Sequence, residues 1–262
     1  MGCAPSSEVF QPIPDSFESI EEVQKALRQV GLQSSDLIIA VDFTESNLVK
    51  GAETFEGRSL HYLDKTGRVR NPYQELISAI TRVFELFDDD DSIPAFGFGG
   101  YPERPVEKRY FPFVEGRGCE LDEVLQQYFA IASRMELNAS ASFVPVIHKT
   151  IKMARKSSRY HILIIISNGH IDDPALVRKA IVEASEYPIS IVMIGVGDGP
   201  WNIMKEFDDQ LPERLFDNFQ FVDYNTIPRG NLNNPDGGFA LQALMEIPEQ
   251  YNKMQALGLI KN

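Results

Sequence analysis

The sequence predicts an α/β fold with a doubly wound, mostly parallel central sheet and helices on both faces. Two observations lead to this prediction. Short continuous apolar runs, typical of strands buried on both faces, alternate along the chain with amphipathic helical segments. The 262 residues, 43 % of them hydrophobic, are also enough to build one large core. Residues 1–15 show no periodicity and are expected to form a flexible arm, which leaves residues 16–262 for the folded domain.

The expected elements follow in chain order. A first helix is expected to begin at the capping box Ser19-Ile20-Glu21-Glu22 and to stop at Gly31. Strands are expected at 37–41, which ends at Asp42, and at 95–98, 160–166, 189–196 and 219–222. Helices are expected at 72–87, 121–135, 143–155, 173–187, 201–207 and 238–257. The polar stretches 47–71 and 100–120 are connections with room for an edge hairpin.

The charge balance narrows the classes of function. There are 25 Lys and Arg against 38 Asp and Glu, which gives a net charge of −13. This argues against nucleic-acid binding and against docking on anionic lipid through a basic patch. The apolar runs are too short to span a bilayer, no signal peptide is evident, and two cysteines cannot form a four-thiolate zinc site. We therefore expect a soluble intracellular domain.

A cluster of oxygen-bearing side chains follows the first expected strand. Asp42, Thr44 and Ser46 alternate there, so one carboxylate and two hydroxyls can reach a common point. These are hard ligands that suit Mg²⁺ or Mn²⁺. The same residues also suit a turn that caps the next element, and spacing alone favours that structural interpretation.

The N-terminus matches a lipidation pattern. Gly2 becomes terminal once Met1 is removed, and Ser6 completes the N-myristoylation motif. One myristoyl chain binds membranes with only about 10⁴ M⁻¹, so stable anchoring needs a second signal. Cys3, a palmitoylation candidate, is the one visible second signal, because the first basic residue is Lys25. Many unmodified proteins also begin with Met-Gly, but Cys3 and Ser6 together favour lipidation.

The remaining motifs indicate structure rather than catalysis. The glycine-rich segment 195–199 matches neither a dinucleotide fingerprint nor a P-loop, and it predicts a tight turn from strand to helix. His148, His161 and His170 lack the spacing of a metal site, and Cys119 has no identifiable base. We therefore expect no catalytic residues and no enzymatic activity.

Several blocks of the chain, taken together, resemble the copine family. They are Asp42-Phe43-Thr44-Glu45-Ser46-Asn47, Asn71-Pro72-Tyr73, Phe96-Gly97-Phe98-Gly99, Ser142-Phe143-Val144-Pro145-Val146-Ile147, and Gly195-Val196-Gly197-Asp198-Gly199-Pro200-Trp201. Phe207-Asp208-Asp209 and Asp217-Asn218-Phe219-Gln220-Phe221-Val222 continue the similarity. The late blocks are closest to the plant copine-like RING ubiquitin ligases. The resemblance implies a von Willebrand factor A-type domain with a metal-ion-dependent adhesion site (MIDAS).

In such domains the motif Asp-x-Ser/Thr-x-Ser binds Mg²⁺ or Mn²⁺, and a carboxylate of the partner usually completes the coordination. Asp42, Thr44 and Ser46 match this first loop. The resemblance therefore implies that partner proteins bind at this edge of the sheet.

The second and third loops depart from the family pattern. The second loop usually carries a threonine ligand, and Ala141 occupies that position, with Ser140 and Ser142 on either side as candidate replacements. The third loop usually ends in Asp-Gly, and Asn168 replaces the aspartate. A neutral amide then stands where the family has an anion. We expect metal binding that is weaker than the family norm, or absent.

These observations predict a membrane-anchored adaptor or signalling domain that binds partner proteins. Copines generally carry C2 domains for calcium-dependent phospholipid binding, and lipid anchoring is expected to replace them here. The alternative is a component or substrate adaptor of a ubiquitination pathway, since the RING-type ligand set is missing after Cys119. The expected location is the cytoplasmic face of a membrane, with a cytoplasmic fraction and the nucleus as further compartments.

Overall fold

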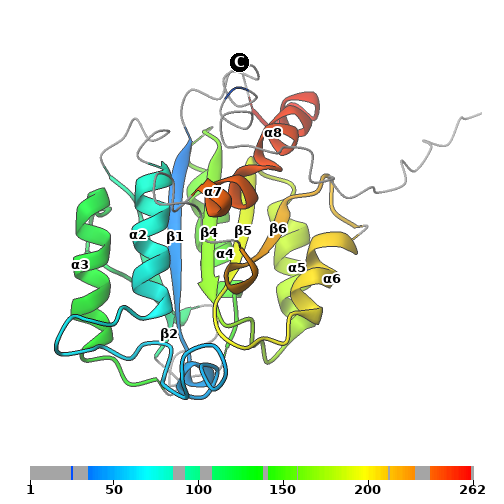
Figure 1. Ribbon diagram of the computed structural model, residues 1–262. Coiled ribbons are helices and arrows are strands. Elements are labelled where there is room, and N and C mark those ends of the chain that lie inside the picture. The colour runs from blue at the N-terminus through cyan, green and yellow to red at the C-terminus, as the bar shows by residue number, and fades with distance from the viewer. Residues whose placement is uncertain are drawn as a thin grey trace, which may run out of the picture.

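The computed structural model describes Lys25 and residues 35–84, 92–100, 108–137, 141–157, 159–211, 213–227 and 237–260. Within them, six strands form one sheet in the order β3-β2-β1-β4-β5-β6 (Figure 1). The strands are β1 (Asp36–Phe43), β2 (Ala95–Gly99), β3 (Tyr110–Pro112), β4 (His161–Ser167), β5 (Ile189–Gly195) and β6 (Phe219–Asp223). All neighbouring pairs are parallel except β2 and β3. The expected doubly wound, mostly parallel α/β fold is confirmed.

Helices cover both faces of the sheet (Figure 1). One face packs against α2 (Pro72–Phe84), α3 (Leu121–Ala132), α7 (Gly237–Leu244) and α8 (Ile247–Ala256). The other packs against α4 (Val144–Ala154), α5 (Pro174–Ala184) and α6 (Asn202–Asp209). Along β1, Ile39 and Val41 enter the first core and Ile38 and Ala40 the second. This explains why the strand is apolar at successive positions: both of its faces are buried.

The structure shifts several expected boundaries. β1 continues through Asp42 to Phe43 rather than ending before the carboxylate. The expected C-terminal helix is two helices, α7 and α8, and Pro248 lies in the first turn of α8, where a missing N–H costs nothing. An edge strand does form within 100–120: β3 pairs antiparallel with β2. The expected first helix lies outside the described residues except for Lys25, which is helical.

A buried ion pair lies at the amino edge of the sheet, just before β6. Arg214 Nη1 lies 2.7 Å from Asp217 Oδ1, and the guanidinium also donates to the carbonyls of Asp208 and Leu211. The nearby Asp208 carboxyl is partly buried. Its burial, and after that the charge of Asp217, raise its pKa to about 8. Asp208 is therefore largely protonated in the folded protein at neutral pH.

Asp208 should make stability fall as the pH rises. The unfolded carboxyl loses its proton near pH 4 and the folded one near pH 8, so between these values the folded state holds the extra proton. Relative to the wild type, Asp208→Asn should gain about 1 kcal/mol per pH unit between pH 5 and pH 8. Urea unfolding at both pH values measures this, with the exposed Asp209→Asn as the control. Parallel pH dependences of wild type and Asp208→Asn would contradict the expectation.

Candidate metal centre

The predicted oxygen cluster lies where the two halves of the sheet diverge. β1 leads to β2 on one side of the sheet and lies beside β4 on the other, so the β1–β4 boundary is the switch point at which such folds bind ligands. Val41 pairs with Ile166, which places the next residues, Asp42 and Ser167, side by side. Asp42 has an exposed fraction of 0 %. The expectation that the cluster begins after the strand is wrong for Asp42, because β1 includes it.

Both oxygens of Asp42 already accept hydrogen bonds from the protein. Oδ1 accepts from the Thr44 N–H at 2.8 Å and from the Thr44 hydroxyl at 2.6 Å. Oδ2 accepts from the Ser167 hydroxyl at 2.6 Å and from Asn168 Nδ2 at 3.4 Å. Burial raises the pKa of Asp42, and these hydrogen bonds oppose the rise. Removing the side chain would leave buried donors unpaired, so Asp42→Ala is expected to destabilise the fold.

Three neutral oxygens gather above this carboxylate. Thr44 Oγ1 lies 3.1 Å from Ser46 Oγ, which lies 3.2 Å from Asn168 Oδ1 and 2.9 Å from Asn168 Nδ2. Adjacent ligands in a magnesium octahedron are separated by about 3.0 Å, given metal–oxygen distances of about 2.1 Å. Because the Thr44 hydroxyl donates its proton to Asp42, its lone pairs remain available. The spacing of these oxygens therefore fits a small hard cation.

The second loop adds no oxygen ligand from the described residues. Ala141, which is 2 % exposed, has no oxygen in its side chain. Ser142 Oγ accepts from the Val144 N–H at the start of α4, and Ser140 lies outside the described residues. In the described part of the chain, no three His, Cys, Asp or Glu side chains gather as a metal site. The spacing of these oxygens thus fits Mg²⁺ or Mn²⁺, but the buried Asp42 carboxylate is the one negative charge among these donors.

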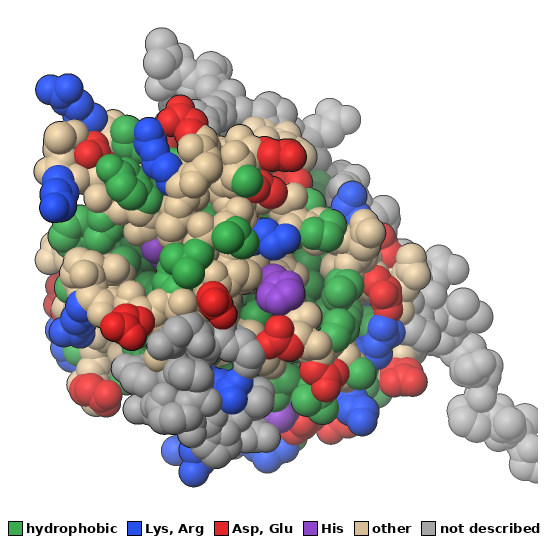
Figure 2. All heavy atoms as spheres, turned by 90° about the horizontal axis from the view of Figure 1, so that it is seen from below, with side chains coloured by type: hydrophobic (Ala, Val, Ile, Leu, Met, Phe, Trp, Pro, Cys, Tyr) green, Lys and Arg blue, Asp and Glu red, His purple; other side chains and the backbone are tan. Residues whose placement is uncertain are grey.

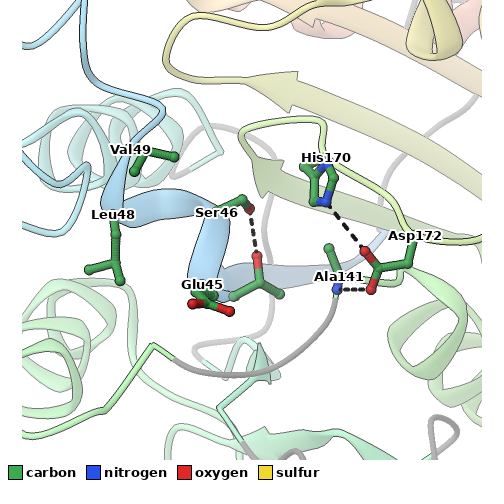
Figure 3. A pocket seen from close by; sticks show the side chains of 8 residues that line it. Glu45, Ser46, Leu48, Val49, Ala141, His170 and Asp172 are labelled. Carbon is green, nitrogen blue, oxygen red and sulfur yellow. Dashed lines mark hydrogen bonds and ion pairs between the residues drawn. The ribbon is translucent and has the colours of Figure 1, made fainter.

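A pocket of about 440 Å³ opens beside the oxygen cluster. Eight residues line it: Thr44, Glu45, Ser46, Leu48, Val49, Ala141, His170 and Asp172. The 3₁₀ helix η1 (Glu45–Leu48) and Val49 form one wall, and His170 and Asp172 stand on the opposite side (Figure 3). Leu48 is 48 % exposed and Val49 is 69 % exposed. The same edge, seen from below, carries hydrophobic side chains among acidic and histidine ones (Figure 2).

Hydrogen bonds shape the far wall of this pocket. Asp172 Oδ2 accepts from the Ala141 N–H at 2.9 Å, and its Oδ1 lies 3.3 Å from His170 Nε2. The neighbouring Asp173 caps α5 by accepting from two backbone N–H groups. Among the residues that the structure describes, Glu45 and Asp172 are the carboxylates that line the pocket, and no Lys or Arg lines it. A polar floor with an apolar rim suits a side chain of a protein partner.

A buried histidine that the sequence analysis missed supports the cluster from beneath. The His61 ring stacks between Phe43 and Tyr73, with centroid distances of 4.7 Å and 4.2 Å. Its Nε2 lies 2.7 Å from the Asp42 carbonyl oxygen, and its Nδ1 lies 2.8 Å from the Tyr128 hydroxyl. Burial lowers the His61 pKa to about 4, so the ring is neutral. Since a carbonyl only accepts, Nε2–H donates to Asp42 and Nδ1 accepts from Tyr128.

Asn47 is the second missed supporting residue. Its Nδ2 donates to the carbonyls of Asp42 and Thr44 at 3.2 and 3.1 Å, and its Oδ1 accepts from the Tyr73 hydroxyl at 2.7 Å. These bonds hold the backbone that carries the three-residue oxygen motif. Asn47 follows that motif directly, so its position was a usable signal. His61 lies in an irregular segment, where no local pattern indicates its contact with β1.

Two minor expectations also have structural outcomes. The 195–199 segment leads from the end of β5 toward α6, as expected, and bends with positive φ at Gly197 and Gly199. The Lys50 ammonium donates to the Gly199 carbonyl, and the Asp198 N–H donates to the Lys50 carbonyl. Cys119 is buried, and burial raises the pKa of its thiol to about 11. A thiol this weakly acidic is a poor nucleophile at neutral pH, in agreement with the expectation.

Comparison with known proteins decides the family. The family model described as Copine matches residues 59–262. The chain belongs to the copine family. It is 41 % identical over 251 residues to Copine family protein 2 of Caenorhabditis elegans, which covers 94 % of this chain and 3 % of that protein. The resemblance carried by the sequence motifs is thereby confirmed.

Plant ubiquitin ligases are similar over nearly the same length. E3 ubiquitin-protein ligase RGLG5 of Arabidopsis thaliana is 40 % identical over 266 residues, which cover 96 % of this chain and 61 % of the ligase. RGLG3 of the same plant is 41 % identical over 262 residues, with 94 % and 70 % covered. The chain therefore spans 3 % of the length of Copine family protein 2 and 61 % of the length of RGLG5.

Solved structures were matched at lower identity. The manganese-loaded TRAP protein of Plasmodium vivax has a TM-score of 0.46 and 12 % identity, covering 74 % of this chain and 70 % of that one. A von Willebrand factor type A protein from Catenulispora acidiphila has a TM-score of 0.44 and 11 % identity, covering 86 % and 43 %.

His61 should make the protein sensitive to acid. Its folded pKa of about 4 lies below the unfolded value near 6.5, so between these values the unfolded state binds the extra proton. The stability that His61 contributes is present above pH 6.5 and is lost as the pH falls through 4, on the order of 3 kcal/mol in total. His61→Gln cannot titrate and should flatten this dependence in urea unfolding between pH 7 and pH 4.5. The control is the half-exposed His148→Gln, which should keep the wild-type slope.

Proposed function

We propose that this copine-family chain is a protein-interaction domain that binds partners at the carboxyl edge of its sheet. A weakly held Mg²⁺ or Mn²⁺, completed by a partner's carboxylate, would form the contact. The observation that carries the proposal is the cluster of Thr44 Oγ1, Ser46 Oγ and Asn168 Oδ1 beside an open pocket. The absence of a second charged ligand at Ala141 and Asn168 supports weak binding of the metal.

Electrostatics support a partner contact that depends on the metal. Glu45 and Asp172 are acidic groups beside the oxygen cluster, so a partner's carboxylate approaching without a cation meets like charges. When bound, a divalent cation supplies the positive charge that such a carboxylate needs. Thr44, Ser46 and Asn168 would hold it, and Asp42 would orient the first and the last of them through its hydrogen bonds. Leu48 and Val49 would add an apolar contact at the rim.

Calorimetric titration of Mg²⁺ and Mn²⁺ tests the metal site. The wild type should bind at millimolar concentrations. Asn168→Asp should bind at least tenfold more tightly, because it adds a carboxylate beside the cation. Ser46→Ala should abolish binding, and Ser142→Ala, whose hydroxyl faces the start of α4, should not.

Fluorescence of Trp201, the one tryptophan of the chain, gives a second readout. Its ring lies against Gly169, where an added Cβ would come within 2.5 Å of the indole. The tryptophan therefore reports on the loop that carries Asn168. If neither wild type nor Asn168→Asp responds at 10 mM metal, about tenfold above the Kd of weak protein sites, the metal-dependent contact is refuted.

We also propose that N-terminal lipids hold the domain at the cytoplasmic face of a membrane, with a fraction in the cytoplasm and in the nucleus. Gly2 and Cys3 lie outside the described residues, so the support is the sequence motif and the two-signal requirement for stable anchoring. Across the described residues, the helices lack the length and apolar character needed to span a bilayer.

Membrane fractionation tests the lipid anchor. Gly2→Ala blocks N-myristoylation and should move the protein from the membrane pellet to the supernatant. Cys3→Ser should leave weak, reversible binding, since one myristoyl chain alone gives about 10⁴ M⁻¹. Ser7→Ala is a matched control outside the motif positions and should behave as the wild type. An unchanged distribution of Gly2→Ala would rule the anchor out.

A second candidate function is that of a substrate adaptor in ubiquitination. The similarity of about 40 % to the RGLG ligases favours it. A RING needs eight Cys or His ligands, and these 262 residues contain two cysteines and four histidines, so they cannot supply that activity themselves. Incubation with ubiquitin, activating enzyme and conjugating enzyme should yield chains only when a RING-bearing relative is added. Equal substrate modification with and without this chain would argue against the adaptor role.

A further inference from the structure

Charge is unevenly distributed in this acidic protein. Residues 137–171 contain no Asp or Glu, although the whole chain has 38. The same stretch holds five basic residues: Lys149, Lys152, Arg155, Lys156 and Arg159. Four of them lie on α4 or within two residues of its end. The helix therefore carries a concentrated positive charge on a protein whose net charge is −13.

Three of these lysines form one face, which we call the lysine face: Lys149, Lys152 and Lys156. Steps of three and four residues place them on the same side of a helix. Lys152 and Lys156 are exposed, and the Lys149 ammonium lies 5.4 Å from the ring centre of Phe96 on β2 and 5.9 Å from that of Tyr110 on β3. The face thus looks toward the β2–β3 edge of the sheet.

The lysine face lacks acidic partners in the described structure. Glu183 of α5 pairs with His148 and Arg155, on the α5 side of the helix. Asp36 at the start of β1 pairs with Arg159. Among the described residues, no ion pair involves Lys149, Lys152 or Lys156. Burial lowers the pKa of Lys149, and the charges of the other two lysines lower it further.

Like charges three or four residues apart destabilise a helix by a few tenths of a kcal/mol per pair. An anionic partner would remove that repulsion. Salt confines each charge to about 8–10 Å, so a ligand on this face meets the lysines rather than the net charge of the protein.

We propose that the lysine face binds an acidic segment of a protein partner. The width of the face favours a peptide over a bilayer, because the face is only one helix wide. On one side it is bordered by Glu183 of α5 and by Glu186, which follows that helix. A flat anionic membrane would meet those carboxylates, whereas a narrow chain of Glu or Asp side chains can follow the lysines. The face does not include the oxygen cluster, so this binding is independent of the metal proposed above.

Fluorescence anisotropy with a labelled 12-residue peptide of alternating Glu and Ser tests the proposal, on the full chain without metal. We expect saturable binding that weakens steeply between 50 and 200 mM NaCl. Lys152→Glu with Lys156→Glu should raise the Kd at least tenfold, and the corresponding Gln pair should raise it by a smaller factor. Both positions are exposed, so thermal melting should show an intact fold.

The matched control is Lys179→Glu with Lys253→Glu, which makes the same change in net charge on exposed positions of α5 and α8. This pair should change the Kd less than twofold. Equal losses in both pairs would mean that net charge alone drives binding and would overturn the proposal. The absence of peptide binding at 1 mM would also overturn the proposal. If the wild type then sediments with vesicles that contain 30 % phosphatidylserine, the lysine face binds a membrane instead of a peptide.

Discussion

The buried carboxylate of Asp42 sets the geometry of the carboxyl edge. Placing a charge inside a dry core is costly unless several donors compensate for the lost water. Here the donors come from the end of β4, from the residue that follows it and from the loop between β1 and η1, so satisfying one side chain joins Thr44, Ser167 and Asn168 into one network. The oxygens of Thr44 and Asn168 that would face a ligand are held in place because both residues donate hydrogen bonds to the buried Asp42 carboxylate.

A layer of aromatic rings connects the Asp42 network to helices α2 and α3. His61 lies between Phe43 of β1 and Tyr73 of α2, and it connects the Asp42 carbonyl to Tyr128 of α3. The neutral ring can donate at one nitrogen and accept at the other, which no other side chain of that shape does. The candidate site is therefore coupled to the α2–α3 layer by contacts that involve neither a metal nor a partner.

The two proposed contact surfaces differ in charge. The pocket at the carboxyl edge is bounded by Glu45 and Asp172, whereas α4 presents Lys149, Lys152 and Lys156. α4 begins three residues after Ala141, which lines the pocket, so one short helix links the two surfaces. With a cation bound, both surfaces would take carboxylates of a partner, whereas the pocket without a cation repels them, so the metal would decide whether one acidic partner engages both surfaces.

The sequence by itself determined the layered α/β fold, the positions of most strands and the family. Continuous apolar runs need burial on both faces, and that requirement is readable along a single strand such as residues 37–41. The motif at Asp42, Thr44 and Ser46 was also readable, because its members are neighbours in the chain. Tertiary structure alone decided that Asp42 is buried, that Ser167 and His61 bind it, and that the Ser142 hydroxyl accepts from the Val144 N–H. These contacts join residues up to 125 positions apart, and local patterns carry no information about which distant groups will satisfy a buried donor or acceptor.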